Sequence, residues 1–246
     1  MNAIILAAGL GTRLRPLTDN TPKALVDVGG KTMLEHQILN LKKAEVDNLV
    51  INIHYFGEQI INFLKANNNF GLNIKISDER ELLLDTGGGI AKAGCLFEND
   101  APILVHNVDI FTNVDLKKVY DEGDKYDVML VTEKPRSNRV LFFADNRLCG
   151  WKNKATNETI LTSEEYTPNP NDERAFMGIH VLNAKTIRLM REHKEAFPLI
   201  PFYLNASKNE ELNIGELFCN DDIVRVDAGK PEVLDKCKEI IDRFYL

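Results

Sequence analysis

Short apolar runs alternate with longer amphipathic segments along the first half of the chain. The first run, residues 3–7, contains no polar side chain, which is typical of a strand covered on both faces of a sheet. Similar runs follow at residues 49–53, 74–76, 103–105 and 128–131. Because strands that alternate with helical segments form βαβ units, the pattern predicts an α/β fold around a mainly parallel sheet.

The segments between these runs have helical spacing. Leu34, Ile38 and Leu41 fall on one helical face, and apolar residues at 60–64 do so after Gly57. Both segments are predicted to be crossover helices. Near the C-terminus, Pro231 stands where a helix can begin, and the apolar residues after it form one face.

The second half of the chain has a different pattern. Two apolar runs flank Asp145-Asn146, which predicts a β-hairpin over residues 140–151. Residues 152–174 are polar and contain prolines, so they are predicted to form a loop. Residues 175–182 return to the pattern of a strand.

Composition and charge are ordinary for a globular protein. The 246 residues are 44% hydrophobic and 27% charged, and residues 1–246 are predicted to form a single domain. No apolar run approaches the ~20 residues that span a bilayer, and the N-terminus lacks the basic region of a signal peptide. A cytoplasmic location without membrane contact is therefore expected. The net charge of −7 disfavours a nucleic-acid surface, which requires clustered lysine and arginine.

A glycine-rich loop follows the first strand. Gly9 and Gly11 lack a Cβ, so their backbone N–H groups can approach an anion at the strand end where α/β sheets bind ligands. The dinucleotide-binding motif is excluded because Leu14 occupies its third glycine position. Gly30-Lys31-Thr32 resembles the end of a P-loop, but Leu25 occupies the position of the first P-loop glycine. The loop predicts a phosphate site of neither standard type.

Basic side chains follow this loop. Arg13 and Arg15 come directly after the glycines, and Lys23 follows Thr21-Pro22. Each of them alone could be an ordinary surface charge. Two guanidinium groups and an ammonium group close to one loop can neutralise a polyphosphate, so the set favours a nucleotide as ligand.

The block at residues 6–25, LAAGLGTRLRPLT followed by PKAL, resembles the signature of sugar-phosphate nucleotidyltransferases. The resemblance spans nearly the whole chain and continues in the segments GGK at 29–31, DTGGG at 85–89, NVD at 107–109, FMGI at 176–179 and DAGKPE at 227–232. It implies a Rossmann-like, three-layer fold with a mixed, mostly parallel sheet between helices. Residues 1–132 would be the nucleotide-binding half and residues 133–246 the sugar-phosphate-binding half.

The resemblance implies an activity that joins a nucleoside triphosphate to a sugar 1-phosphate and releases pyrophosphate. At matched catalytic positions, Arg13 would steady the leaving pyrophosphate and Lys23 would bridge the reacting phosphates. Asp109 and Asp227 match a pair of metal-binding carboxylates, and the expected cofactor is Mg²⁺, which prefers oxygen ligands. The expected nucleotide contacts are Leu6, Ala8, Gly9, Leu10, Gly11, Thr12, Arg13, Lys23, Glu79, Gly87 and Gly88.

The sugar phosphate is expected to contact Asn107, Lys152 and Gly178. In members of this family, a Glu-Lys-Pro sequence after the hairpin usually supplies a lysine to the sugar phosphate. The sequence Glu133-Lys134-Pro135 precedes the predicted hairpin, whereas Lys152 follows it. Lys152 is therefore the predicted contact.

The identity of the base stays open. Relatives that use uridine or thymidine nucleotides often have a glutamine upstream of the glycine-rich turn predicted at residues 85–90, and this chain has none there. Glu79 or Glu81 could accept hydrogen bonds from the base, or the backbone of Gly87 or Gly88 could read it. The chain is most similar to compact N-acetylmuramate 1-phosphate uridylyltransferases and mannose 1-phosphate guanylyltransferases, which favours UTP.

Other functions are kept as alternatives. They are a guanylyltransferase acting on a mannose- or heptose-type 1-phosphate, a phosphocholine cytidylyltransferase, and a catalytically silent subunit that senses nucleotide sugars. The matched charged residues disfavour the silent subunit. A glycosyltransferase is disfavoured because Phe111 breaks the Asp-x-Asp pair that would begin at Asp109. Small-molecule substrates are the expected partners, and the protein is expected to be a monomer or small homo-oligomer.

Overall fold

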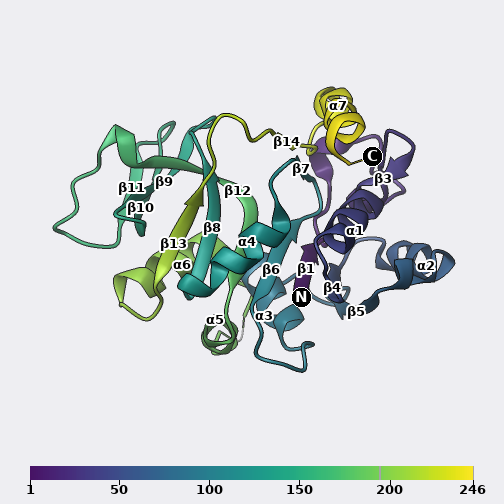
Figure 1. The fold of residues 1–246 in the computed structure, drawn as a ribbon, viewed down its shortest axis with the longest axis horizontal. Coiled ribbons are helices and arrows are strands. Elements are labelled where there is room, and N and C mark those ends of the chain that lie inside the picture. Colours follow the sequence, from purple (N-terminus) through teal and green to yellow (C-terminus); the bar gives the residue numbers. More distant parts are fainter. Residues whose placement is uncertain (194, 246) are drawn as a thin grey trace.

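A ten-stranded mixed sheet runs through the computed structural model, which describes residues 1–193 and 195–245 (Figure 1). One part of the sheet is parallel, in the order β5-β4-β1-β6. The bounds are β1 (Asn2–Leu6), β4 (Asn48–Ile53), β5 (Asn73–Asp78) and β6 (Ile103–Asn107). These strands and the predicted strand at residues 128–131, which is part of β8 (Val128–Glu133), are confirmed.

The remainder of the sheet is mixed. β12 (Glu173–Leu182) is antiparallel to both β6 and β8, and β13 (Ile214–Phe218) is parallel to β8. The predicted hairpin is confirmed as β9 (Arg139–Ala144) and β10 (Arg147–Asn153).

The loop predicted at residues 152–174 is wrong in part, because it contains β11 (Glu158–Leu161). This short edge strand pairs antiparallel with β10, with Ile160 opposite Trp151. Its side chains are mostly exposed, so the sequence of β11 has no apolar period that would predict a strand. The strand is formed by its backbone hydrogen bonds to β10.

Helices cover both faces of the sheet. Their bounds are α1 (Met33–Lys43), α2 (Gly57–Ala66), α3 (Asp85–Gly94), α4 (Leu116–Glu122), α5 (Ala184–Met190), α6 (Leu199–Lys208) and α7 (Leu234–Phe244). Short 3-10 segments are η1 (Thr12–Leu14), η2 (Lys23–Leu25), η3 (Asn68–Gly71), η4 (Gly123–Lys125), η5 (Pro170–Asp172) and η6 (Pro231–Val233). The predictions of α1, α2 and the C-terminal helix are confirmed. No helix in the described ranges is both long and apolar enough to cross a membrane.

The glycine-rich turn predicted at residues 85–90 is wrong, because these residues form the start of helix α3. Glycine has a low helix propensity, but here the missing side chains allow close packing. A Cβ on Gly87 would lie 2.3 Å from the Phe197 ring, and one on Gly94 would lie 2.4 Å from Ile187. Tertiary packing therefore overrides the local propensity.

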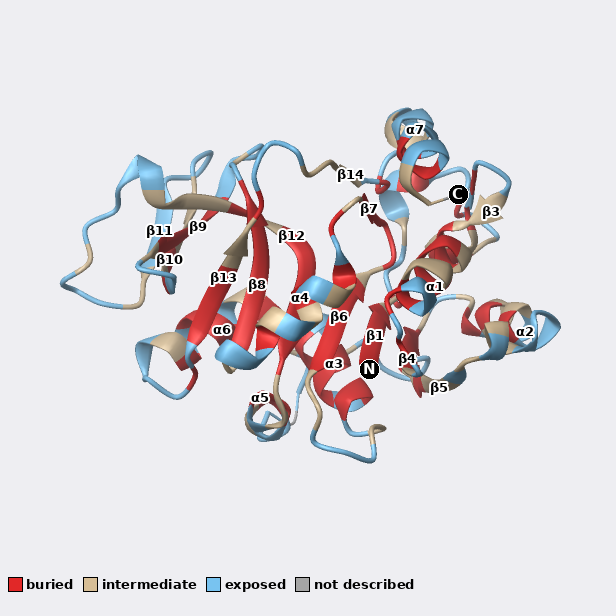
Figure 2. Cartoon of the chain, viewed as in Figure 1, coloured by how far each residue is buried: buried red, intermediate tan, exposed pale blue. Residues whose placement is uncertain are grey.

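Two apolar clusters pack on opposite faces of the sheet. Along β1, Ala3 and Ile5 belong to one cluster and Ile4 to the other, as expected from the alternation of side chains in a strand. Figure 2 shows the central strands buried and the outer loops exposed. The double coverage explains why the strand at the centre of the sheet is apolar throughout.

The C-terminal strand and helix pack against elements from the first half of the chain. β7 (Ile110–Thr112) pairs antiparallel with β14 (Arg225–Asp227), and α7 packs near β7 and the hairpin formed by β2 (Asp27–Val28) and β3 (Lys31–Thr32). In Figure 1, α7 lies beside β3 and α1. Residues from both ends of the sequence therefore meet at one edge of the domain.

Candidate functional site

A cavity of about 300 Å³ opens beside the carboxyl ends of β1, β4 and β6. Parallel strands end at the same edge of a sheet, where open α/β folds bind ligands. The cavity brings together these predicted residues: Leu6, Ala8, Gly9, Lys23, Glu79, Asn107 and Asp109. It also contains Asn52, Leu83, Asp85, Thr86 and Val108, which were not predicted.

The glycine-rich loop after β1 is folded against Thr18. Gly11 has a φ of 65°, and a Cβ on it would lie 2.9 Å from Thr18 Cγ2. The Thr18 hydroxyl donates a hydrogen bond to the Gly11 carbonyl oxygen at 2.8 Å. Thr12 and Arg13 follow in η1, which the fully buried Leu14 anchors, while Leu10 is exposed. The loop thus needs glycine at position 11 for both its conformation and its space.

Lys23 and Asp109 form an ion pair at the edge of this cavity. Lys23 begins η2, Asp109 follows β6, and the ammonium group contacts Asp109 Oδ2. Both side chains are largely removed from solvent, at 13% and 12% exposure. The pair joins a predicted phosphate-binding cation to a predicted metal-binding carboxylate.

Asp227 reaches the same edge from the other end of the chain. It lies opposite Ile110 in the β14–β7 ladder, and the Ala228 N–H donates to the Asp109 carbonyl oxygen at 2.8 Å. Burial, with smaller contributions from the carboxylates of Asp227 and Asp109, raises the pKa of Cys237 to about 12. Both carboxylates therefore act on the same buried thiol.

The two aspartates fit a Mg²⁺ site that substrate would complete. In residues 1–193 and 195–245, no three His, Cys, Asp or Glu side chains cluster in a way that could hold a metal ion by themselves. Mg²⁺ commonly binds one or two carboxylates and takes its other ligands from phosphates and water. Asp109 is nearly buried and Asp227 is exposed, so at least one of the two carboxylates is accessible from solvent.

Asn52 organises the inner wall of the cavity. Its Oδ1 accepts hydrogen bonds from the N–H groups of Ala7 and Ala8 at 2.6 and 3.2 Å, and its Nδ2 donates to Glu79 Oε1 at 2.8 Å. The signal that could have identified Asn52 is that it is a polar residue inside the apolar run of β4.

Glu79 is tied into this wall. Its Oε2 accepts from the Leu84 N–H at 3.1 Å, and the residue is 1% exposed. Burial raises the pKa of its carboxyl group, against the hydrogen bonds from Asn52 and Leu84. Both carboxylate oxygens are thus engaged by the protein, and the contact between Glu79 and a base stays a prediction.

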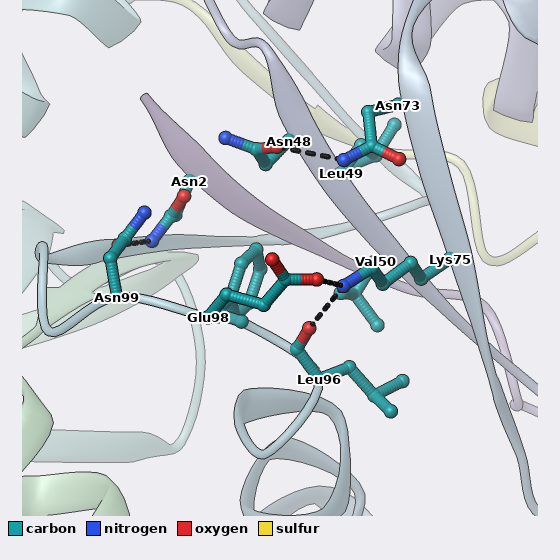
Figure 3. Close-up of a pocket in the computed structure, with 10 residues that line it drawn as sticks. Asn2, Asn48, Leu49, Val50, Asn73, Lys75, Leu96, Glu98 and Asn99 are labelled. Atoms are coloured by element: carbon teal, nitrogen blue, oxygen red, sulfur yellow. Dashed lines mark hydrogen bonds and ion pairs between the residues drawn. The ribbon is translucent and has the colours of Figure 1, made fainter.

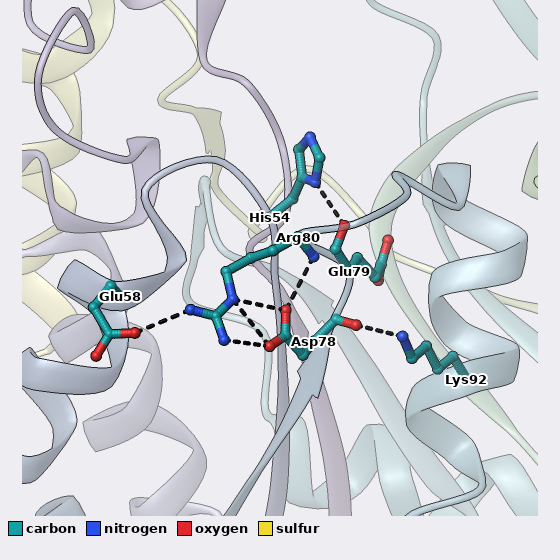
Figure 4. A network of polar contacts seen from close by, with 6 residues as sticks. All are labelled: His54, Glu58, Asp78, Glu79, Arg80 and Lys92. Atoms are coloured by element: carbon teal, nitrogen blue, oxygen red, sulfur yellow. Dashed lines mark hydrogen bonds and ion pairs between the residues drawn. The ribbon is translucent and has the colours of Figure 1, made fainter.

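The segment between β5 and α3 is held from several sides (Figure 4). Arg80 lies between Asp78, at 2.6 Å, and Glu58, at 3.0 Å. His54 Nδ1 donates to the Glu79 carbonyl oxygen at 2.7 Å, and Lys92 of α3 reaches the Asp78 carbonyl oxygen. These contacts hold the end of β5 in place, and Lys92 ties it to α3.

The first residues of α3 divide between cavity and core. Asp85 and Thr86 line the cavity, whereas Gly87 and Gly88 are buried inside the helix packing. The Gly87 N–H donates to the Phe197 carbonyl oxygen at 3.0 Å. The predicted backbone contacts of Gly87 and Gly88 with a base stay untested, and two polar side chains missed by sequence reasoning face the cavity instead.

A second cavity, of about 630 Å³, lies beside Asp227 and the β9–β10–β11 meander. Its apolar wall includes Trp151, Ile160, Phe176 and Ile200. Its basic side chains are Arg136, Arg139 and Arg225. This combination of an apolar wall and guanidinium groups can hold a ligand with both apolar and anionic parts.

The three arginines differ in their partners. Arg225 and Arg136 both lie near the buried carboxylate of Glu133, at 2.7 and 3.2 Å. Arg139 makes no ion pair with any residue in the described ranges. It is therefore the guanidinium most available to an anion.

The residues predicted to contact the sugar phosphate are only partly brought together. Gly178 has a φ of 78°, and a Cβ on it would lie 2.8 Å from Asn107 Nδ2, so these two are neighbours. Lys152 lies opposite Val140 on β9, one position beyond Trp151, and lines neither cavity. Its contact with the sugar phosphate stays a prediction. Lys134 is exposed and pairs with Asp221 at 2.6 Å.

A small cavity of about 90 Å³ lies at the opposite, amino-terminal edge of the parallel strands (Figure 3). Asn2 donates to Asn99 at 2.7 Å, and Asn73 donates to Asn48 at 2.9 Å. Lys75 pairs with Glu98 at 2.6 Å. Because these polar groups satisfy one another, this cavity is not a candidate for the functional site.

Comparison with known proteins identifies similar chains. The family model described as nucleotidyl transferase matches residues 2–196. The N-acetylmuramate alpha-1-phosphate uridylyltransferase of Caulobacter vibrioides is 48% identical over 109 residues, 44% of this chain and 45% of that protein. Mannose-1-phosphate guanylyltransferase 1 of Arabidopsis thaliana is 32% identical over 204 residues, 73% of this chain and 56% of that protein. The chain spans about half the length of these curated relatives.

A solved structure shares the fold. The crystal structure of HddC from Yersinia pseudotuberculosis complexed with GMP-PN has a TM-score of 0.74 at 22% identity, and the match covers 97% of this chain and 98% of that one. The Rossmann-like, three-layer α/β fold expected from the sequence is confirmed. With the family model matching most of its length, the chain belongs to the nucleotidyl transferase family.

Proposed function

We propose that this protein transfers a nucleotidyl group from a nucleoside triphosphate to a sugar 1-phosphate. The observation that carries the proposal is the Lys23–Asp109 ion pair at the carboxyl edge of the sheet, with Asp227 brought beside it by the β7–β14 ladder. A phosphate oxygen of the sugar 1-phosphate attacks the α-phosphorus. The bond from that phosphorus to the bridging oxygen breaks, and pyrophosphate leaves with the electron pair.

The protein's own residues serve this reaction by positioning and by neutralising charge. Phosphoryl-type transfer needs little covalent help from protein, because the attacking oxygen is already anionic. Lys23 neutralises the reacting phosphates, and Arg13, beside Gly229, faces the leaving pyrophosphate. Asp109 and Asp227 would hold Mg²⁺, which supplies further positive charge to the α-phosphate when bound.

We favour UTP and an N-acetylmuramate-type 1-phosphate as substrates. The relative at 48% identity is named as a uridylyltransferase of that sugar phosphate. An N-acyl, carboxylate-bearing sugar suits a cavity lined by Trp151, Ile160 and Phe176 together with Arg139, which makes no ion pair in the described ranges. Guanidinium groups bind carboxylates well, and an acyl methyl group is stabilised by apolar surface.

Guanylyl transfer to a mannose-type 1-phosphate is the second candidate. It is supported by the relative from Arabidopsis thaliana, which matches more of this chain at lower identity. Such a sugar carries neither an acyl group nor a carboxylate, so it would leave Arg139 without a partner in the larger cavity.

The test is pyrophosphate release by the purified protein with Mg²⁺, using each of the four nucleoside triphosphates against a panel of sugar 1-phosphates. The panel contains the 1-phosphates of N-acetylmuramate, N-acetylglucosamine, glucose and mannose, together with phosphocholine. We expect UTP with N-acetylmuramate 1-phosphate to give the highest kcat/KM. GTP with mannose 1-phosphate as the best pair would establish the second candidate. No release with any pair would contradict nucleotidyl transfer.

A further inference from the structure

Asp85 has an unusual conformation at the mouth of the nucleotide cavity. It is the first residue of α3 and lines the cavity, yet its φ is 58°, a region that residues with a side chain rarely adopt. Glycine would fit this backbone more easily.

The other polar groups at this end of the cavity already have partners within the protein. Asn52 uses both ends of its amide on Ala7, Ala8 and Glu79, and Glu79 uses both oxygens on Asn52 and Leu84. The N–H group of Gly87 is bound to Phe197. Each of these groups thus already has a hydrogen-bond partner within the protein, and Asn52 and Glu79 are buried.

Asp85 keeps one acceptor free. Its Oδ1 accepts from the Thr86 N–H at 2.6 Å, which fixes the orientation of the carboxylate. Within the described ranges, Oδ2 has no hydrogen-bond or ion-pair partner, and neither does the hydroxyl of Thr86. The cavity is thus lined by one oriented acceptor and a neighbouring hydroxyl, in addition to the Lys23–Asp109 pair.

We infer that Asp85 is the specificity-determining residue for the base, and that its Oδ2 accepts the imide N–H of an oxo base. This inference rests on the proposed function, because it requires that a nucleotide occupies the cavity. It names the class of base: uracil through N3–H, with guanine N1–H as the purine equivalent. The Thr86 hydroxyl can donate to the adjacent base carbonyl.

The discrimination follows from the chemistry of the ring edge. An ionised carboxylate accepts hydrogen bonds and cannot donate them. Uracil carries a hydrogen on N3, whereas cytosine carries a lone pair at the same position, so one placement of the ring is attractive for uracil and repulsive for cytosine. Asp85 is exposed, and a base bound against it would cover its carboxylate. A covered acceptor that loses its donor is costly, so the contact discriminates between bases.

Asp85→Asn tests the orientation directly. The Thr86 N–H needs an acceptor, so the amide oxygen replaces Oδ1 and the NH₂ group takes the place of the free Oδ2. A donor then faces N3 of the base. We expect the ratio of the dissociation constants for CTP and UTP to fall at least about 10-fold from its wild-type value, with adenine gaining on guanine in the same way.

Asp85→Gly tests whether the carboxylate or the backbone matters. Glycine adopts a φ of 58° without strain, so the variant should melt at the same temperature as the wild type or higher. The same variant should bind UTP about 10-fold or more weakly. If Asp85 served only folding, the Asp85→Gly variant would melt at a lower temperature and bind UTP as tightly as the wild type.

Asp145 supplies a matched control. It has the same residue type and a φ of 49°, and it lies in the β9–β10 turn away from both cavities. Asp145→Asn and Asp145→Gly should leave the affinities for all four triphosphates within about twofold of the wild type.

The experiment is isothermal titration of the full chain with UTP, CTP, GTP and ATP in Mg²⁺, followed by the pyrophosphate assay. Unchanged UTP affinity and unchanged base discrimination in both Asp85 variants would overturn the inference and leave the proposed function standing. Discrimination that shifts as expected, without pyrophosphate release from the wild type, would support the inference and contradict the proposed function. A wild type that binds no triphosphate would overturn both.

Discussion

The guanidinium group of Arg13 occupies the space that a Cβ would fill on Gly229. Its Nη2 lies 2.6 Å from that position, and Asp227 Oδ1 lies 2.7 Å from it. A residue of the N-terminal loop and a carboxylate from the C-terminal part of the chain therefore pack against one glycine. The absence of a side chain at position 229 is what allows both charged groups to be present.

Gly229→Ala should lower activity by acting on Arg13. The added methyl group displaces the guanidinium, and a displacement of about 1 Å in a positioning group can reduce turnover 10- to 100-fold. Pyrophosphate release is the measurement. If the effect passes through Arg13, the double variant Arg13→Ala/Gly229→Ala should be no slower than Arg13→Ala alone. Fully additive losses would show that Gly229 acts through another group, such as Asp227.

Asp109→Asn and Asp227→Asn should each reduce turnover by about 100-fold or more at saturating Mg²⁺. Each variant removes one of the two carboxylates proposed to hold the ion. Circular dichroism should show the fold intact, and the Mg²⁺ concentration for half-maximal rate should rise. Near wild-type turnover in either variant would remove that residue from the proposed metal site.

Arg139→Ala and Lys152→Ala separate two predictions about the sugar phosphate. From the sequence, Lys152→Ala should raise the KM for the sugar 1-phosphate by a factor on the order of 10 to 200. From the position of Arg139 in the larger cavity, Arg139→Ala should raise the KM for N-acetylmuramate 1-phosphate more than that for N-acetylglucosamine 1-phosphate. Lys134→Ala is the control, because its exposed pair with Asp221 contributes little. Equal KM values in the Arg139 variant and the wild type would exclude a carboxylate contact.

Two buried histidines should make the protein sensitive to acid. Burial lowers the pKa of His180 from 6.5 to about 3 and that of His106 to about 4. Below pH 6.5 the unfolded chain therefore binds protons that the folded chain excludes. The contribution of the two histidines to the free energy of unfolding is thus fully present above pH 6.5 and is lost as the pH falls toward 4. Each histidine contributes about 3 kcal/mol to this loss.

His180→Leu isolates one of these contributions. Both ring nitrogens of His180 are buried without a hydrogen-bond partner in the described ranges, so an apolar replacement breaks no hydrogen bond. Urea unfolding at pH 7 and pH 4 should show a loss smaller by about 3 kcal/mol than that of the wild type. An equal loss in both proteins would mean that His180 is protonated or hydrated in the folded state.

The sequence predicts features that have a local cause. The alternation of apolar runs predicts the parallel strands, and Asp145-Asn146 predicts the β9–β10 hairpin because the turn is local chemistry. The glycine loop and the Lys23 segment predict the cavity edge for the same reason. A strand such as β11, formed by pairing with an existing edge, has no such local signal.

Features that depend on distant neighbours could not be predicted in this way. The three glycines at the start of α3 looked like a turn because Phe197, which occupies the space left by Gly87, is far away in sequence. The engagement of Glu79 depends on Asn52, and the side of β10 on which Lys152 lies depends on the strand register. A motif shows which residue types are present, but it does not show which of their polar atoms already have hydrogen-bond partners in the fold.

The pairing of β14 with β7 also sets the time at which the site can form. A ribosome makes the glycine loop, Lys23 and Asp109 early, and the main sheet is complete with β13. Asp227 and Gly229 emerge only afterwards, and they must dock onto residues synthesised long before them. A nascent chain can therefore carry most of its folded core while still being unable to assemble both carboxylates, so the proposed chemistry begins only after Asp227 has left the ribosome.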